Sequence, residues 1–403
     1  MSDVPSTSLF KVIPKIHLPD FPLVIWMVFL ALLLGLAAGM GAHQVVTTLN
    51  FGFGRALGEF ALILLPSFTL AAALSRQSIT SNAAGKAVAL ASPVAGAGMI
   101  CPDTAYAALS PAAGRYKIDI AFGAFAGFKL LYPAGPLIVA TGLGVSGVEG
   151  NKTAILLLCG ALLLLPVWAA GVMWGRFAAR GGAIPGETKD DPDSKRLLRA
   201  FAPFLVIAAL VGLGSLIGPT GIGALDFLLL PKGALIIAAI LALLQTSPDQ
   251  RRECLDSAVR RTGSLLLVIG AASAFGAVLT GLVPFDHLAP RGDGALTLIA
   301  LFALTVLFKL LQGSSMTTFA AIAPVAAPVV AASGANEIAA VFAICLGSFV
   351  AILPNDSYYW LVRRDALESE QSEARVMHIL AGGAVMQALV GMAVLLAAVT
   401  LWN

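Results

Sequence analysis

The sequence predicts an all-α polytopic membrane protein, built as inverted repeats with two re-entrant hairpins and two broken helices. Of the 403 residues, 58% are hydrophobic and 12% are charged. A soluble domain has about 45–50% apolar and about 25% charged residues, so a water-soluble enzyme, a disordered chain and a nucleic-acid binder are excluded. The apolar stretches are long and continuous, which indicates helices rather than the alternating strands of a β-barrel. Polar residues and helix breakers interrupt several of these stretches.

Candidate membrane helices follow from the length of the apolar stretches, because one crossing needs about 20 mostly apolar residues. The candidates are 22–42, 57–74, 87–110, 118–145, 153–175, 200–218, 233–248, 263–283, 295–311, 317–333, 337–362 and 376–401. The first follows a leader over residues 1–20 that lacks a clean small-residue cleavage site. We therefore expect a retained helix rather than a removed signal peptide.

The basic residues set the expected orientation, because Lys and Arg concentrate in cytoplasmic loops. The groups that should share this side are the leader, the 75–86 loop, Arg115 with Lys117, and the loops 176–199, 249–261 and 363–375. If 87–110 crossed the membrane, Arg115 and Lys117 would lie outside. We therefore predict that this segment is a re-entrant hairpin with its turn near 101–104.

The second half meets the same requirement if 295–333 is a hairpin with its tip at 312–315, although three full crossings would also meet it. With the hairpin, each half contains a helix, a hairpin and a broken helix in the same order and opposite orientation, an arrangement that recurs in secondary transporters. The expected divisions are a cytoplasmic leader (1–20), a first transmembrane half (21–175), a cytoplasmic linker (176–199) and a second transmembrane half (200–403).

Four segments place helix breakers and hydrogen-bonding residues at membrane depth: 101–106, 129–136, 309–318 and 354–358. Unwound backbone persists there only where it lines a cavity or packs in protein. A half-helix that begins at a break presents free N–H groups and a partial positive charge, which favour a carboxylate. The pattern therefore predicts a binding site for a small organic anion.

These segments supply the candidate site residues. For substrate binding they are Asp103, Thr104, Lys129, Pro133, Gly135, Lys309, Gln312, Gly313, Ser314, Ser315, Thr317, Asn355 and Ser357. Asp356 and Asp103 are the candidates for ion coupling, because a buried carboxylate can take up a proton or help to bind sodium. Structural roles remain open: either lysine could snorkel or pair with an acid, and either aspartate could cap a helix.

The sequence contains no nucleotide-binding motif, no paired metal-ligand spacing and no catalytic constellation. We therefore expect no cofactor, no metal ion and no catalytic residue, and we expect that the protein is not an enzyme.

A family resemblance rests on three stretches of the second half. Residues 270–279, 312–314 and 355–361 resemble, in the same order, the Gly-rich, Gln-Gly-Ser and Asn-Asp-Ser segments of the gluconate permease (gluconate:proton symporter) family, within the ion transporter superfamily. In the first half, 132–144 is similar to that family's Pro-rich stretch, and 101–106 is similar to its Phe-Phe-Asp segment. The chain departs from the family at Ala134, where the family has His, and at Lys309, near the family's Arg.

The resemblance implies a secondary active transporter that takes up gluconate or a related small hydroxy-carboxylate with a coupled cation, a proton being preferred. It also implies an elevator-type homodimer in a bacterial inner membrane, and the basic residues of the leader predict a cytoplasmic N-terminus. The expected partners are a small organic anion, the coupling cation, the lipid bilayer and a second copy, with no nucleic acid. Two alternatives remain: a sodium-coupled di- or tricarboxylate-type carrier and, from a different class, an anion channel.

Overall fold

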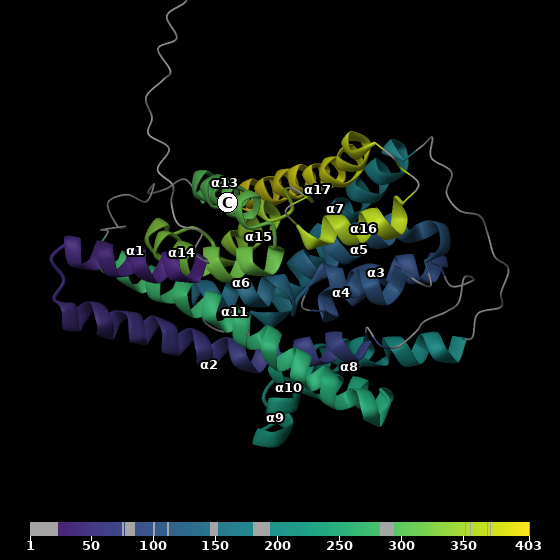
Figure 1. The fold of residues 1–403 in the computed structure, drawn as a ribbon, viewed down its shortest axis with the longest axis horizontal. Helices are drawn as coiled ribbons and strands as arrows, with labels where there is room; N and C mark the ends of the chain where they lie inside the picture. Colours follow the sequence, from purple (N-terminus) through teal and green to yellow (C-terminus); the bar gives the residue numbers. More distant parts are fainter. Residues whose placement is uncertain are drawn as a thin grey trace, which may run out of the picture.

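The computed structural model describes residues 23–74, 76, 85–99, 101–110, 113–145, 152–179, 194–282, 294–350, 352–354, 356–368, 370 and 372–402. The regular structure of these residues is helical (Figure 1), so the predicted all-α class is confirmed. The helices up to the central linker are α1 (Leu23–Ala37), α2 (Ala42–Leu74), α3 (Gly85–Gly98), α4 (Pro102–Leu109), a 3-10 turn (Gly114–Tyr116), α5 (Lys117–Leu130), α6 (Gly135–Leu143) and α7 (Thr153–Ala178). Those after it are α8 (Ser194–Ile217), α9 (Gly223–Leu229), α10 (Pro231–Gln245), α11 (Pro248–Leu282), α13 (Gly294–Gln312), α14 (Ser315–Ser333), α15 (Glu337–Gly347), α16 (Ser357–Ala366) and α17 (Glu373–Trp402).

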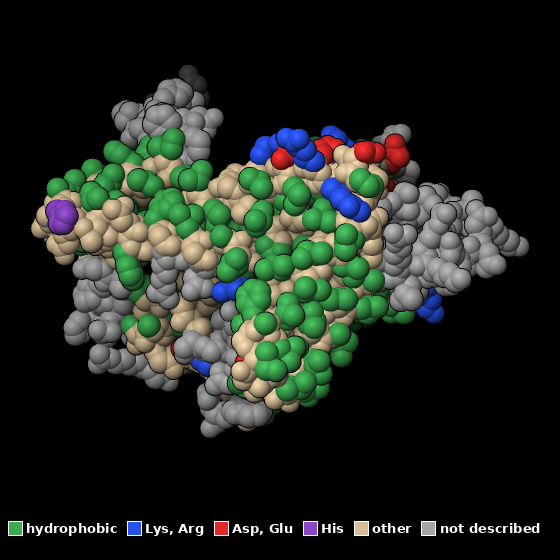
Figure 2. All heavy atoms as spheres, turned by 90° about the horizontal axis from the view of Figure 1, so that it is seen from below, with side chains coloured by type: hydrophobic (Ala, Val, Ile, Leu, Met, Phe, Trp, Pro, Cys, Tyr) green, Lys and Arg blue, Asp and Glu red, His purple; other side chains and the backbone are tan. Residues whose placement is uncertain are grey.

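Several of these helices suit a membrane. Among the described residues, five are long and apolar enough to cross one, or six if the bent pair α9–α10 is a single span. Their outward faces are apolar: on α7, Leu158, Leu162 and Leu165 are each more than 60% exposed. Figure 2 shows hydrophobic side chains over much of one face, with charged side chains gathered mainly along one edge. The apolar part of this face is suited to contact with lipid tails.

All four predicted interruptions are helix breaks in the structure. Helices α3 and α4 are separated at 99–101, α5 and α6 at 131–134, α13 and α14 at 313–314, and α15 and α16 at 348–356. Local chemistry accounts for the breaks: Pro102 begins α4, and Gly313 has a left-handed backbone (φ 73°) before α14.

Three features differ from the prediction: the length of α2 in the first half, and the length of α11 and a bend between α9 and α10 in the second half. Helices α2 and α11 extend well beyond the expected spans 57–74 and 263–283, and they pack along one another (Figure 1). The unexpected feature is a 77° bend between α9 and α10. Leu230 is extended there (ψ 153°) because it precedes Pro231, which disfavours the helical conformation of the residue before it.

Helix contacts in the two halves are reciprocal. Helix α3 packs on α5, as α13 packs on α15; α6 packs on α14, as α16 packs on α4. Across the halves, α2 packs on α11, α5 on α15 and α7 on α17. Such reciprocity is expected of two structurally similar halves.

The centre of the molecule is formed by α5 and α15. Residues 119–130 of α5 and 339–347 of α15 are all buried. Glycines bring α3 and α5 unusually close: a Cβ on Gly127 would lie 1.9 Å from the carbonyl oxygen of Pro93, and one on Gly96 would lie 2.3 Å from that of Ala124. Small residues allow such close helix contacts in membrane proteins. Helix α5 therefore packs in close contact with α3 at the centre of the molecule.

Candidate substrate site

Lys309 and Asp356 form a buried ion pair between two helix breaks. Lys309, in the last turn of α13, places Nζ 2.5 Å from Oδ2 of Asp356, and the two side chains are 0% and 4% exposed. The ammonium also donates to the carbonyl oxygen of Gly313. Oδ1 of Asp356 accepts from the backbone N–H of Tyr358 at 3.0 Å, so Asp356 is the N-cap of α16. This carboxylate therefore serves both the charge pair and the helix start.

Lys129, at the end of α5, is completely buried. Its ammonium donates to the carbonyl oxygen of Ser348, beside the end of α15. It lies 3.6 Å from the ring centroid of Phe125 and 4.8 Å from that of Phe349. Among the residues that the structure describes, no acidic side chain lies within ion-pair distance of it. A buried charge without a counter-charge is costly, so this position favours the approach of an anion.

Asp103 connects the break between α3 and α4 to this region. It lies in the first turn of α4, where its Oδ1 accepts a 2.8 Å hydrogen bond from the hydroxyl of Ser357 at the start of α16. Thr104 is engaged locally, since its hydroxyl donates to the carbonyl oxygen of Cys101 at 2.9 Å. Of the two aspartates, only Asp356 caps a helix; the N-cap of α4 is Cys101.

The predicted residues of the α13–α14 break have different environments. Ser314 is the N-cap of α14 and accepts from the backbone N–H of Thr317 at 3.4 Å. Ser315 is buried, and its hydroxyl has no hydrogen-bond partner among the described residues. Gln312 and Thr317 are half-buried. Asn355 lies outside the described residues.

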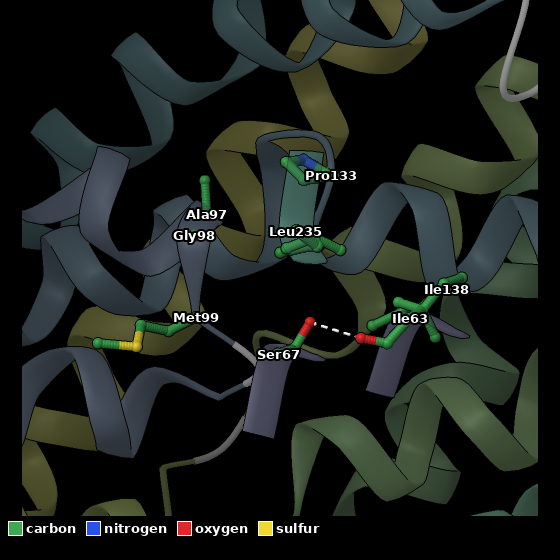
Figure 3. A pocket seen from close by; sticks show the side chains of 9 residues that line it. Ile63, Ser67, Ala97, Gly98, Met99, Pro133, Ile138 and Leu235 are labelled. Carbon is green, nitrogen blue, oxygen red and sulfur yellow. Dashed lines mark hydrogen bonds between the residues drawn. The ribbon is translucent and has the colours of Figure 1, made fainter. Parts of the chain in front are cut away.

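Pro133 lies at a separate, small and mainly apolar pocket (Figure 3). Met99 from the α3–α4 break and Pro133 from the α5–α6 break both line it, together with Leu235 of α10. The one hydroxyl in its lining, that of Ser67, donates to the carbonyl oxygen of Ile63 at 2.7 Å (dashed in Figure 3). None of the predicted charged residues lines this pocket.

Gly135, at the start of α6, allows the backbone of α6 to lie close to the end of α5. A Cβ at Gly135 would lie 2.8 Å from the carbonyl oxygen of Phe128.

Two buried tyrosines that the sequence reasoning did not select hold the aspartate segments in place. Tyr358 donates to the carbonyl oxygen of Ala121 in α5 at 2.6 Å and stacks on Phe125 with ring centroids 5.5 Å apart. Tyr106 of α4 donates to Oδ2 of Asp365 at 2.7 Å. The available signal was the position of each tyrosine within a few residues of a predicted break, in an otherwise apolar stretch.

A multi-helix bundle whose interrupted helices gather buried charges is the architecture of a membrane transporter. Residues 202–401 match the family model described as GntP family permease. Over 387 residues the chain is 26% identical to the low-affinity gluconate transporter of Escherichia coli K12, with 83% of this chain and 85% of that protein covered. It is 24% identical to the high-affinity gluconate transporter of the same strain, with 84% and 86% covered. The resemblance to the gluconate permease family is thereby confirmed.

Two solved structures share the fold. The YdaH transporter of Alcanivorax borkumensis has a TM-score of 0.56 and 17% identity, with 94% of this chain and 98% of that chain covered. MtrF of Neisseria gonorrhoeae has a TM-score of 0.63 and 13% identity, with 94% of this chain and 95% of that chain covered. Its structure is said to illuminate a class of antimetabolite efflux pumps. With these relatives and its apolar helices, the chain is a multi-pass membrane protein with a transporter fold.

Proposed function

We propose that this protein is a secondary active transporter that takes up gluconate or a related small hydroxy-carboxylate, coupled to a proton. The observation that carries the proposal is Lys129, a fully buried ammonium that has no acidic partner among the described residues and lies beside the broken helix α15–α16. A substrate carboxylate would supply the missing counter-charge, and the curated relatives are gluconate transporters.

The surrounding polar groups suit a hydroxylated anion. The N-terminal ends of α14 and α16 each carry a partial positive charge, which would favour a bound carboxylate. Thr317 and Ser357 are partly or fully exposed and offer hydroxyl groups to the substrate's own hydroxyls, with Ser314, Gln312 and Asn355 of the same segments as further candidates. In this proposal Lys309 contributes positive charge at the α13–α14 turn.

The reciprocal packing supports the proposed architecture. In it, α3–α4 and α13–α14 are the re-entrant hairpins, and α5–α6 and α15–α16 are the broken helices of two inverted halves, 21–175 and 200–403. The protein would work as an elevator-type homodimer in the inner membrane, with the leader and the 176–199 linker in the cytoplasm.

For proton coupling, Asp103 is the better of the two candidates. Asp356 already uses both oxygens, one in the pair with Lys309 and one in the cap of α16. Among the described residues, Ser357 is the one side chain that donates a hydrogen bond to Asp103. Taking up a proton at Asp103 therefore breaks fewer interactions than at Asp356.

Uptake of labelled gluconate by the purified protein in liposomes tests the proposal. We expect that an inward proton gradient drives gluconate accumulation and that an uncoupler abolishes it. We expect the rate of uptake by Lys129→Met to be at least tenfold lower than that of the wild type. Lys152→Met is the matched control, because Lys152 pairs with Glu337 near the surface. Wild-type uptake in Lys129→Met would refute the role of Lys129, whereas uncoupled current through a continuous pore would favour a channel.

Substrate choice can be measured separately by thermal shift. A ligand that binds the folded protein raises its unfolding temperature with the logarithm of its concentration above Kd. We expect gluconate to stabilise the protein more than glycerate, hydroxybutyrate or dicarboxylates. A larger shift with dicarboxylates would favour the di- or tricarboxylate carrier instead.

A further inference from the structure

The ammonium of Lys309 contacts two oxygen groups of the kind that also bind metal cations, and a third oxygen, without a partner among the described residues, lies nearby in the sequence. It contacts the carboxylate of Asp356 at 2.5 Å and the carbonyl oxygen of Gly313, which lies in the break between α13 and α14. The C-terminal end of α13, at Gln312, carries a partial negative charge that faces the same turn. Ser315, two residues after Gly313, has a buried hydroxyl with no partner in the described part of the chain. Carboxylate, carbonyl and hydroxyl oxygens together are ligands for a hard cation.

Transporters with interrupted helices hold their coupling sodium ions with unwound backbone carbonyls and the C-terminal ends of half-helices. Here the side chain of Lys309 brings its own positive charge to that kind of position, fully buried and covalently attached. A sodium ion could not occupy the same place while the ammonium is there.

We propose that Lys309 acts as a tethered cation that replaces a sodium ion at the α13–α14 turn, so that this transporter works without sodium. The inference rests on the proposed function, cation-coupled uptake, and adds that sodium is not the coupling cation. Its physical consequence is specific: removal of the ammonium leaves Asp356 and the Gly313 carbonyl as an open oxygen site, and sodium should then bind.

Lys129 provides the matched comparison. Its ammonium is equally buried, but it faces two aromatic rings and one carbonyl, with no carboxylate among the described residues within ion-pair distance. Removing that ammonium leaves a mostly apolar space that offers sodium too few oxygen ligands. A sodium response is therefore expected in Lys309→Ala and not in Lys129→Ala.

The test is the unfolding temperature of the purified protein at pH 8, in sodium chloride and in choline chloride of the same concentration. We expect no difference for the wild type and a saturable rise of about 3 °C or more in sodium for Lys309→Ala. The rise should disappear in Lys309→Ala/Asp356→Asn, which lacks the carboxylate, and should be absent in Lys129→Ala. No rise in a folded Lys309→Ala, or an equal rise in Lys129→Ala, would overturn the proposal.

Two further arms keep the test decisive. If Lys309→Ala does not fold, the wild type still decides, because sodium-dependent stabilisation or sodium-dependent uptake of the wild-type protein would contradict the inference. Since the thermal measurement needs no substrate, a failure of gluconate uptake would reject the proposed function while leaving the sodium result interpretable. If uptake by Lys309→Ala is measurable, sodium should increase it severalfold and choline should not.

Discussion

Ser357 donates a 2.8 Å hydrogen bond to Asp103, and so joins the first turn of α16 to the first turn of α4 across 254 positions of sequence. Both residues follow helix breaks, and each break belongs to a different half of the chain. The contact therefore places the α3–α4 break next to the α15–α16 break.

Replacing Asp103 separates charge from hydrogen bonding. Asp103→Asn can still accept from Ser357, so we expect its unfolding temperature to stay within about 2 °C of the wild type. It cannot exchange a proton, so accumulation driven by a proton gradient should be lost while gluconate exchange at equal concentrations persists. Counterflow and gradient-driven uptake in liposomes measure the two activities.

The control for this prediction is Ser357→Ala, which keeps the carboxylate and loses the bond. It should lower stability by about 1 kcal/mol and weaken gluconate binding through the lost hydroxyl, but the uptake that remains should still be driven by the proton gradient. Undiminished accumulation by Asp103→Asn would show that the coupling proton binds elsewhere.

The buried pair of Lys309 and Asp356 should show strong energetic coupling. Lys309→Met and Asp356→Asn each leave one member without its partner, which costs about 3–5 kcal/mol for a buried ion pair. The double variant removes both charges, so its loss should be smaller than the sum of the single losses by at least about 2 kcal/mol. Denaturation of the four proteins gives this coupling energy, and strictly additive losses would contradict the pairing.

The close contact of α3 and α5 depends on glycine. Gly127→Ala places a Cβ 1.9 Å from the carbonyl oxygen of Pro93, so the helices must separate, at a cost of about 1–3 kcal/mol or more. We expect lower expression and a lower unfolding temperature. Gly54→Ala in α2 is the matched control, because nothing lies within 4 Å of its Cβ, and it should be neutral or slightly stabilising.

Asp365 should contribute more to the free energy of unfolding than its ion-pair partner Lys117. It pairs with Lys117 at 2.7 Å, with side chains about one-third exposed, and it also accepts from the fully buried Tyr106. Lys117→Met breaks a partly exposed pair and should cost about 0.5 kcal/mol. Asp365→Ala also leaves the Tyr106 hydroxyl without its acceptor and should cost about 2 kcal/mol. Equal losses, measured by denaturation, would contradict this ranking.

Local features of the sequence were sufficient to predict four of the helix breaks. Proline and glycine act on their own backbone, and Ser314 and Asp356 cap the helices that follow them, so each effect needs only neighbouring residues. The bend at Leu230 follows the same rule through Pro231, but apolar length alone did not reveal it. The long helices α2 and α11 were underestimated because their polar stretches lower the hydropathy without breaking the helix.

The sequence by itself determined the membrane class, the break positions and the family resemblance, because composition, backbone restriction and short motifs are properties of nearby residues. Only the tertiary structure decided which groups meet. Lys309 pairs with Asp356, whereas the equally buried Lys129 meets the Ser348 carbonyl and two aromatic rings. The farthest of those partners, Phe349, lies 220 positions away from Lys129 in the sequence. Such contacts depend on how α5, α13, α15 and α16 pack together, which no local pattern specifies.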